Sequence, residues 1–229
     1  MNAPINSRKA LLFIGSPKGL KSASHGLGGY LLRKLQAAGM TTETMVVGAA
    51  LHSAAGLAKM YEAVDTADLL ILSFPLYVDQ LPAPLVQAAE LIAERRRARP
   101  ASKPQKIMAI VQCGFPETLQ NQAACDILRQ FAKEAGFEWA GALAMGMGGA
   151  VAGRPLEKAG GMVRNVVKAL DLTADSLVRG GNVPQEAAGL ISRPLTPKWL
   201  YVLIANFGWR SQARKHGARK LVYSKPYTA

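Results

Sequence analysis

Apolar runs alternate along the chain with longer segments in which apolar residues recur every three or four positions. This alternation constrains the fold more than any other feature of the sequence. Four apolar runs and a threonine-rich stretch predict five strands, at residues 10–15, 41–47, 68–74, 107–112 and 137–144. The periodic segments predict a helix after each strand, the last over residues 156–178. Such alternation implies a parallel sheet with helices on both faces, the doubly wound α/β architecture.

Composition narrows the class of protein. The chain has 229 residues, of which 49% are hydrophobic, enough for one large domain or one domain with an extension. No apolar run approaches the ~20 residues that span a bilayer, and the polar start from Met1 to Pro4 does not resemble a signal peptide. Cys113 and Cys125 lack a metal-binding spacing, and the three histidines are scattered. We therefore expect a cytoplasmic protein without a metal site.

Charge is unevenly distributed along the chain. The formal net charge is +13, yet the segment from Arg193 to the end carries eight Lys or Arg and no acidic residue. The preceding part therefore holds 20 basic and 15 acidic residues, a net charge of +5. The C-terminal tail is the basic part of the protein.

Three loops follow strands at the positions where doubly wound sheets bind ligands, residues 16–24, 75–80 and 113–116. The first loop is rich in hydroxyls and lysines, and Ser22 or Ser24 is a suitable N-cap for the helix that Leu27, Leu31 and Leu35 predict. The free amides and the dipole of a helix N-terminus bind phosphate well. The loop matches neither the Walker motif nor the dinucleotide fingerprint, and capping alone would also explain its serines.

Together these loops resemble those of the flavodoxin-like NAD(P)H-dependent FMN oxidoreductases. The family pattern Gly-Ser-Pro-Arg, a spacer and Ser-x-Ser/Thr is matched at residues 15–18 and 22–24, with Lys18 in place of the usual Arg. Lysine keeps the charge but loses the bidentate fork, and His25 departs from the aliphatic or amide residue of the family. The Pro-x-Tyr motif is matched at residues 75–77, and a glycine-bearing loop at residues 113–115.

The resemblance covers roughly residues 9–178 and implies a flavodoxin-like five-stranded parallel sheet of order 2-1-3-4-5 with bound FMN. NADH or NADPH would donate a hydride to the flavin in a ping-pong cycle, and a small-molecule acceptor such as a quinone, an azo or nitro compound, or free flavin would take the electrons. No side chain is needed as a catalytic group. The resemblance implies these cofactor-binding residues: Ser16, Lys18, Ser22, Ser24, Pro75, Leu76, Tyr77, Val78, Cys113, Gly114 and Phe115.

Two other functions stay open at this point. The first is an electron-transfer flavodoxin, although such carriers are usually acidic. The second is a module without redox activity that recruits a partner or a membrane through its tail. Among single residues, Tyr77 would also serve to cap the sheet, Cys113 to pack as a small apolar side chain, and the Arg95–Arg97 run to end a helix in solvent.

Residues 179–229 form a C-terminal extension outside the resemblance. We expect residues 197–217 to be helical and to bury Trp199, Leu203 and Phe207 against protein, in the first instance a second subunit of a homodimer. Peripheral contact with an anionic membrane is the alternative, because basic residues follow the apolar patch directly. Nucleic acid is not expected as a partner, since cations and aromatics are segregated rather than interleaved.

Overall fold

The computed structural model describes residues 8–151 and 155–225. The chain divides into two compact units, residues 1–193 and 194–229. The first unit is built on one five-stranded sheet whose strands are all parallel. The strands are β1 (Lys9–Ile14), β2 (Thr41–Val46), β3 (Leu69–Pro75), β4 (Lys106–Gln112) and β5 (Glu138–Met145). Their order, β2-β1-β3-β4-β5, confirms the predicted topology.

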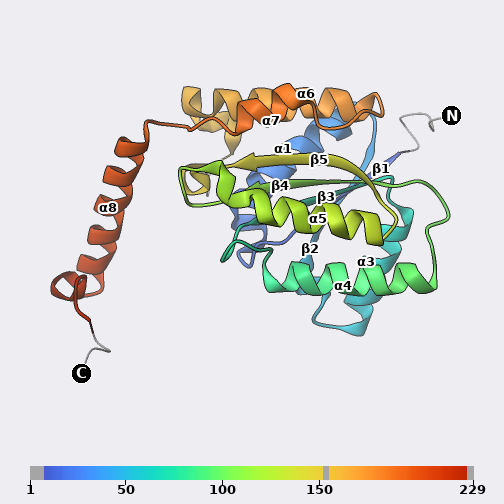
Figure 1. Ribbon diagram of the computed structural model, residues 1–229, viewed down its shortest axis with the longest axis horizontal. Coiled ribbons are helices and arrows are strands. Elements are labelled where there is room, and N and C mark those ends of the chain that lie inside the picture. Colours follow the sequence, from blue (N-terminus) through green and yellow to red (C-terminus); the bar gives the residue numbers. More distant parts are fainter. Residues whose placement is uncertain (1–7, 152–154, 226–229) are drawn as a thin grey trace. The chain divides into compact units, whose positions relative to one another are not determined.

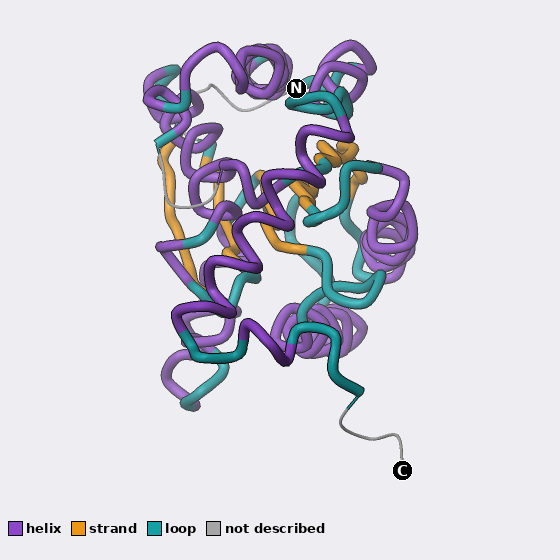
Figure 2. The backbone as a smooth tube through the Cα atoms, turned by 90° about the vertical axis from the view of Figure 1, so that its left-hand side faces the viewer, coloured by secondary structure: helices purple, strands orange, loops and turns teal. Residues whose placement is uncertain are grey.

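Helices cover both faces of this sheet, as Figures 1 and 2 show. One face carries α1, α6 and α7, and the other carries α3, α4 and α5. The bounds are α1 (Ala23–Ala37), α2 (Val47–Ala50), α3 (Ala54–Thr66), α4 (Ala83–Ala98), α5 (Gln122–Glu134), α6 (Arg164–Val178) and α7 (Gln185–Ile191). The doubly wound architecture predicted from the alternating pattern is therefore confirmed.

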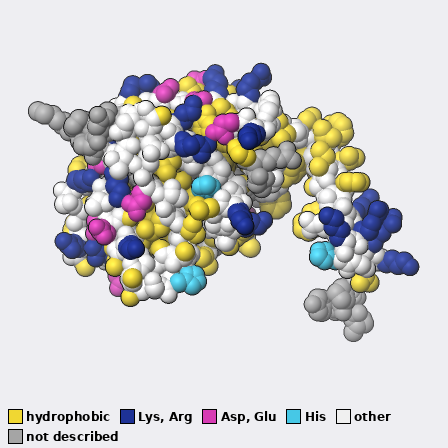
Figure 3. Space-filling view, turned by 180° about the vertical axis from the view of Figure 1, so that it is seen from behind, with side chains coloured by type: hydrophobic (Ala, Val, Ile, Leu, Met, Phe, Trp, Pro, Cys, Tyr) yellow, Lys and Arg dark blue, Asp and Glu magenta, His cyan; other side chains and the backbone are white. Residues whose placement is uncertain are grey.

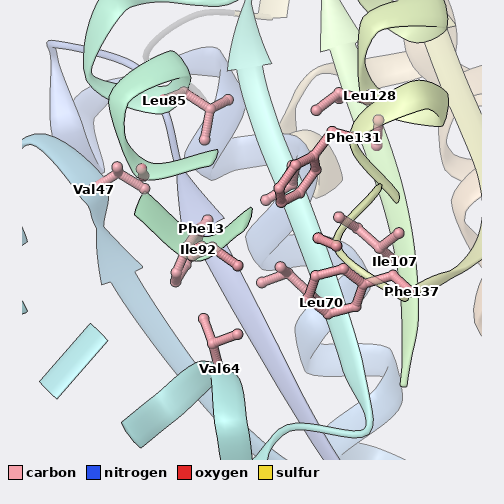
Figure 4. Close-up of a cluster of buried hydrophobic side chains, with 14 of the residues drawn as sticks. Phe13, Val47, Val64, Leu70, Leu85, Ile92, Ile107, Leu128, Phe131 and Phe137 are labelled. Carbon is pink, nitrogen blue, oxygen red and sulfur yellow. The ribbon is translucent and has the colours of Figure 1, made fainter. Parts of the chain in front are cut away.

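The core beneath α3, α4 and α5 is fully apolar (Figure 4). Phe13, Leu70 and Ile107 come from three adjacent strands and are 0–1% exposed. Side chains of successive strand residues point to opposite faces, so Leu12 packs beneath α1 while Phe13 packs on the other side. Burial on both faces is the reason that these strands are almost continuously apolar.

Two details of the predicted elements are wrong. Residues 156–163 form two 3₁₀ turns, Leu156–Lys158 and Gly160–Val163, so that only the later part of the expected helix is α6. Gly160 lies between them with a φ of +70°, which interrupts a right-handed helix. Arg96 is 5% exposed rather than solvated, and it donates to Gln105 Oε1.

The first unit also extends past the expected boundary at residue 178. Helix α7 packs on α6 and β5, and it buries Ala187, Leu190 and Ile191. These apolar side chains complete the layer on the α1 face, so the boundary of the compact unit falls at Arg193. The sequence analysis missed this helix because the resemblance on which the boundary rested ends before it.

The second unit consists of α8 (Lys198–Lys215) followed by a 3₁₀ turn at Arg219–Leu221. The predicted helix over residues 197–217 is confirmed. It ends before Gly217, whose φ of +68° lets the chain reverse. None of the helices in the described ranges combines the length and apolarity that crossing a bilayer requires.

Two neighbouring glycines of α1 provide a test of how tightly this helix must approach the sheet. A Cβ on Gly28 would lie 2.7 Å from Leu12 Cδ1 and 3.0 Å from Ser73 Cβ, whereas the nearest atom to a Cβ on Gly29 is 3.5 Å away. We expect Gly28→Ala to lower the free energy of unfolding by about 1–3 kcal/mol through overpacking. Gly29→Ala is the control and should raise it by up to ~1 kcal/mol through helix propensity. Urea unfolding of both variants measures the difference, and equal effects would contradict the close approach.

Candidate functional site

The three loops singled out from the sequence emerge side by side at one edge of the sheet. They follow β1, β3 and β4, which are adjacent and parallel, so their carboxyl ends lie together. In doubly wound sheets this edge is the ligand-binding edge. The strand order reverses between β1 and β3, the point where such sheets open a crevice.

The loop after β1 is a tight turn that ends in a capped helix. Gly19 has a φ of +53° and begins a 3₁₀ turn, Gly19–Lys21. Ser22 is the N-cap of α1: its Oγ accepts from the His25 amide at 3.1 Å and donates to the Gly19 carbonyl at 2.6 Å. The predicted cap at Ser22 is confirmed, and its hydroxyl is already occupied within the protein.

The first turn of α1 contains hydrogen-bonding groups that the helix itself does not satisfy. Ser24 is fully buried, and its Oγ has no hydrogen-bond partner among the described residues. The amides of Ala23 and Ser24 occupy the first two helical positions, which have no acceptor inside a helix. A hydroxyl and two amides at a helix N-terminus are the donors that a phosphate needs. Because Ser24 is covered, a ligand reaches its hydroxyl only after a local shift of the loop.

The other two predicted residues of this loop have different surroundings. Ser16 is 5% exposed, and its Oγ accepts from the Lys18 amide at 3.3 Å. The Lys18 side chain is exposed at the mouth of the turn. Ser16 therefore shapes the loop, while Lys18 contributes charge at its surface.

A cationic cavity lies beside the start of α1. Its volume is about 450 Å³, and Lys21, Ser22, His25 and Arg33 are among the residues that line it. Arg33 also forms an ion pair with Glu157 at 2.6 Å. The sequence analysis did not identify Arg33, because it lies two to three helical turns beyond the loop. Its recurrence on the same side of α1 as His25, eight positions earlier, was the available signal.

The loop after β3 contains an unusual turn. Tyr77 and Gln80 form an antiparallel bridge with two hydrogen bonds of 3.0 Å, and Val78 and Asp79 between them have φ values of 49° and 59°. Consecutive left-handed residues normally require Asn or Gly, and a β-branched residue is a genuine outlier there. Val78 is also 95% exposed. Strain of this kind is concentrated at functional sites.

This turn presents Tyr77 at the edge of the sheet. Tyr77 is 46% exposed, and with Val78 it borders an open cavity of about 740 Å³ that continues along α4 to Glu90. Pro75 and Leu76 lie behind it, paired with β4 through Gln112. They fix the position of the turn, whereas Tyr77 and Val78 provide its surface.

The loop after β4 is attached to the loop after β5. The Cys113 carbonyl accepts from Gly148 at 2.8 Å, and the Phe115 carbonyl accepts from Met147 at 2.8 Å. A Cβ on Gly114 would meet no atom within 4 Å, so the backbone there faces open space. Phe115 is 57% exposed. Residues 146–148 thus support the site, a role that the sequence analysis did not assign to them.

Cys113 is a buried thiol in a polar surrounding. It is 2% exposed, and its Sγ lies 3.6 Å from the carbonyl oxygens of Phe115 and Glu117 and from Asn121 Nδ2. Burial raises the pKa of the Cys113 thiol above its ordinary value. A protonated, covered thiol packs as a small side chain and is a poor nucleophile.

The edge of the sheet thus has two kinds of surface. Ser22 and its cationic neighbours line one cavity, and Tyr77 and Val78 border another. Gly114 and Phe115 lie at the end of β4, the strand next to β3. Within residues 8–151 and 155–225, His, Cys, Asp and Glu do not gather into a group able to hold a metal ion. The arrangement suits a ligand with an anionic end and a flat, less polar end.

Three solved structures share this fold. The apo form of NADH:FMN oxidoreductase gives a TM-score of 0.58 at 18% identity, over 83% of this chain and 96% of that protein. FMN-dependent NADH-azoreductase from Bacillus anthracis str. Ames Ancestor, in complex with FMN, gives 0.54 at 15% identity, over 75% and 99%. Rubredoxin oxygen:oxidoreductase from Desulfovibrio gigas gives 0.54 at 14% identity, over 77% of this chain. The chain spans only 36% of that protein's length.

Sequence comparison adds no closer relative. No family model matches the chain, and no curated protein matches it. At identities of 14–18% the likeness concerns the backbone arrangement. The first unit of the chain therefore has the flavodoxin-like doubly wound fold.

Proposed function

We propose that the protein is an FMN-dependent oxidoreductase that passes electrons from NADH or NADPH to a small-molecule acceptor. The observation that carries this proposal is the start of α1, where a buried hydroxyl that has no partner among the described residues lies at the N-terminus of a helix on the ligand-binding edge. Similarity of fold to proteins named as an NADH:FMN oxidoreductase and an FMN-dependent NADH-azoreductase supports it.

The phosphate of FMN fits the first loop on chemical grounds. Its negative charge matches the positive end of the α1 dipole and the nearby cations Lys18 and Lys21. The Ser24 hydroxyl, which has no partner among the described residues, would gain an acceptor, and so would the amides of Ala23 and Ser24 at the first two helical positions. Hydrogen bonds to a charged oxygen are worth ~1.5–3 kcal/mol each, which is ample for tight binding.

The flavin ring fits the other two loops. Tyr77 and Phe115 present exposed aromatic surface, and the Gly114 backbone leaves room for a flat group to approach. Bound FMN would supply the redox chemistry, whereas the protein orients it and excludes competing reactions. The acceptor would be a quinone, an azo or nitro compound, or free flavin.

The basic experiment is purification followed by two measurements. A flavin absorbance that survives gel filtration is expected, together with its loss on anaerobic addition of NADH or NADPH. A colourless protein that does not take up FMN would contradict the proposal. A yellow protein that neither nucleotide reduces would favour an electron carrier instead.

The role of Ser24 separates binding from folding. Ser24→Ala removes a buried hydroxyl that has no partner, so the free energy of unfolding of the apoprotein should stay the same or rise. FMN should bind about tenfold to a hundredfold more weakly, because one hydrogen bond to phosphate is lost. The Ser22→Ala/Ser24→Ala double variant should in addition lose ~1 kcal/mol of stability with its helix cap, because the Ser22 hydroxyl is already bonded within the turn. Urea unfolding and fluorescence titration with FMN measure the two quantities.

The matched control is Ser53→Ala. Ser53 caps α3 as Ser22 caps α1, accepting from the Gly56 amide at 3.0 Å. Its loss should cost ~1 kcal/mol of stability and leave FMN affinity unchanged. If Ser24→Ala and the parent protein bind FMN with equal affinity, the phosphate does not lie at this position.

Tyr77 should affect the flavin more than the fold. The ring is 46% exposed, so Tyr77→Ala should change the free energy of unfolding by about 0.5 kcal/mol or less. We expect a shifted flavin potential and a changed rate of NADH or NADPH oxidation, both restored toward the parent values in Tyr77→Phe. Spectroelectrochemical titration and steady-state assays test this. If neither value changes in Tyr77→Ala, the ring does not contact the flavin.

The thiols of Cys113 and Cys125 should be unreactive in the native protein. Burial raises the pKa of Cys113 and raises that of Cys125 to about 11. Near pH 8 we expect slow reaction with Ellman's reagent in buffer and rapid reaction of both thiols in urea. One thiol that reacts rapidly in the native protein would instead indicate a redox role for it.

The same shift predicts a pH dependence of stability. Above ~8.5, the ordinary thiol pKa, the unfolded chain releases the Cys125 proton while the folded chain keeps it. The stability that this thiol contributes is therefore fully present below pH ~8.5. It is lost as the pH rises toward about 11, the pKa of Cys125 in the folded protein. Cys125→Ala should make that part of the decline shallower.

A further inference from the structure

The tail helix α8 is polarised along its length. After Lys198 at its first position, exposed apolar side chains predominate in its first two-thirds, and basic side chains follow from Arg210 onward (Figure 3). The large apolar residues that are at least 49% exposed are Trp199, Val202, Leu203, Ile204, Phe207 and Trp209. An ordinary surface helix instead separates apolar and polar residues onto opposite sides.

Most small or polar residues of the apolar part lie along one line of the helix. Tyr201, Ala205, Gly208 and Gln212 follow one another at spacings of three or four and so share this line along α8. The other lines carry the large apolar side chains together with Asn206, which lies on the line of Trp199 and Leu203. The helix therefore presents a broad apolar surface that one polar residue interrupts.

The basic part encloses a cavity. After Gly217 the chain turns back, and Arg210 Nη2 donates to the Tyr223 hydroxyl at 3.2 Å. The cavity between the two segments has a volume of about 400 Å³, and its lining includes Arg210, Arg214 and Arg219 together with Phe207. Three guanidinium groups around a pocket with an apolar wall suit a phosphate that is attached to an apolar body.

The tail from Arg193 onward contains no Asp or Glu that could pair with these cations. Their complement must come from elsewhere. A second copy of the chain is a poor source, since its tail is equally basic and the rest of it carries a net charge of +5. An anionic phospholipid bilayer supplies negative charge and an apolar layer at the same place.

We propose that the second unit binds the surface of an anionic phospholipid membrane. The segment from Trp199 to Trp209 lies in the interface, and the arginine cavity holds a lipid phosphate. This segment is about 16 Å long, roughly half of the ~30 Å hydrocarbon thickness, so α8 lies along the surface. Trp199 and Trp209 mark its two ends at the level that tryptophan prefers.

Tail fluorescence provides a direct test with the full-length protein. The chain has three tryptophans, and Trp139→Phe leaves only Trp199 and Trp209 as reporters in the tail. We expect their emission to shift to shorter wavelength with vesicles of equal parts phosphatidylglycerol and phosphatidylcholine. Pure phosphatidylcholine vesicles should give a much smaller shift. No shift with the anionic vesicles would overturn the proposal.

Variants separate the two parts of the proposed surface. Arg210→Gln/Arg214→Gln/Arg219→Gln should weaken co-sedimentation with the anionic vesicles by about a hundredfold, from ~fivefold per basic residue near the surface. Leu203→Glu/Phe207→Glu should abolish it by removing the apolar contact. The control Lys59→Gln/Arg129→Gln/Lys133→Gln loses the same charge from exposed sites of the first unit and should retain binding within about threefold. Circular dichroism of each variant verifies that it is folded.

Other occupants of this surface predict other results. If a second copy covers α8, Leu203→Glu/Phe207→Glu will halve the mass measured by light scattering. The parent protein will then not bind vesicles. If the arginines bind nucleic acid, duplex DNA will bind more tightly than the anionic vesicles and compete with them. If they bind soluble phosphate, millimolar inorganic phosphate will saturate the site and vesicles will give no shift. Each of these results would overturn membrane binding.

Discussion

The close approach of α1 to the sheet is the contact on which the site depends. Gly28 admits the helix against Leu12 and Ser73, and the Ser73 hydroxyl donates to the Ser24 carbonyl at 2.7 Å. The first contact sets the distance of the helix from the sheet, and the second fixes its first turn beyond the end of β1. Because Ser73 belongs to β3, the same contact relates the first turn of α1 to the strand that precedes Tyr77. This contact explains why β3, which is otherwise apolar, contains the polar residue Ser73.

Most of the fold could be predicted from the sequence because its signals are local. Four apolar runs and one threonine-rich stretch identified the strands of the sheet, and the family resemblance supplied their order. What could not be predicted depends on contacts between distant residues. Arg96 is buried because Gln105 provides a partner and the Phe137 ring lies 4.5 Å from its guanidinium carbon. Arg96 follows Ile92 by four residues and so lies on the buried side of α4, unlike Arg95 and Arg97, but this spacing does not reveal the partners of its guanidinium group.

The candidate site likewise has features that could be predicted from local sequence and features that could not. Motifs located the three loops, because short loops with hydroxyls, Pro-x-Tyr and glycine have recognisable spacing. Whether those hydroxyls are free was not predictable: Ser22 is occupied within its turn, whereas Ser24 lacks a partner. The supporting role of residues 146–148 depends on backbone hydrogen bonds between two loops that are 30 residues apart, which side-chain patterns do not record. Placement of individual flavin contacts stays a prediction.

The unsatisfied turn at the start of α1 has a consequence for the protein before it acquires a ligand. The buried Ser24 hydroxyl has no partner among the described residues, so this turn opens at a lower cost than it would if that hydroxyl were bonded. Such opening would expose Ser24 and admit a phosphate that the closed turn excludes. Entry of the ligand would then depend on fluctuations of the empty protein, and its presence would suppress them. Slower hydrogen exchange of the first backbone amides of α1 would therefore indicate that the ligand is bound.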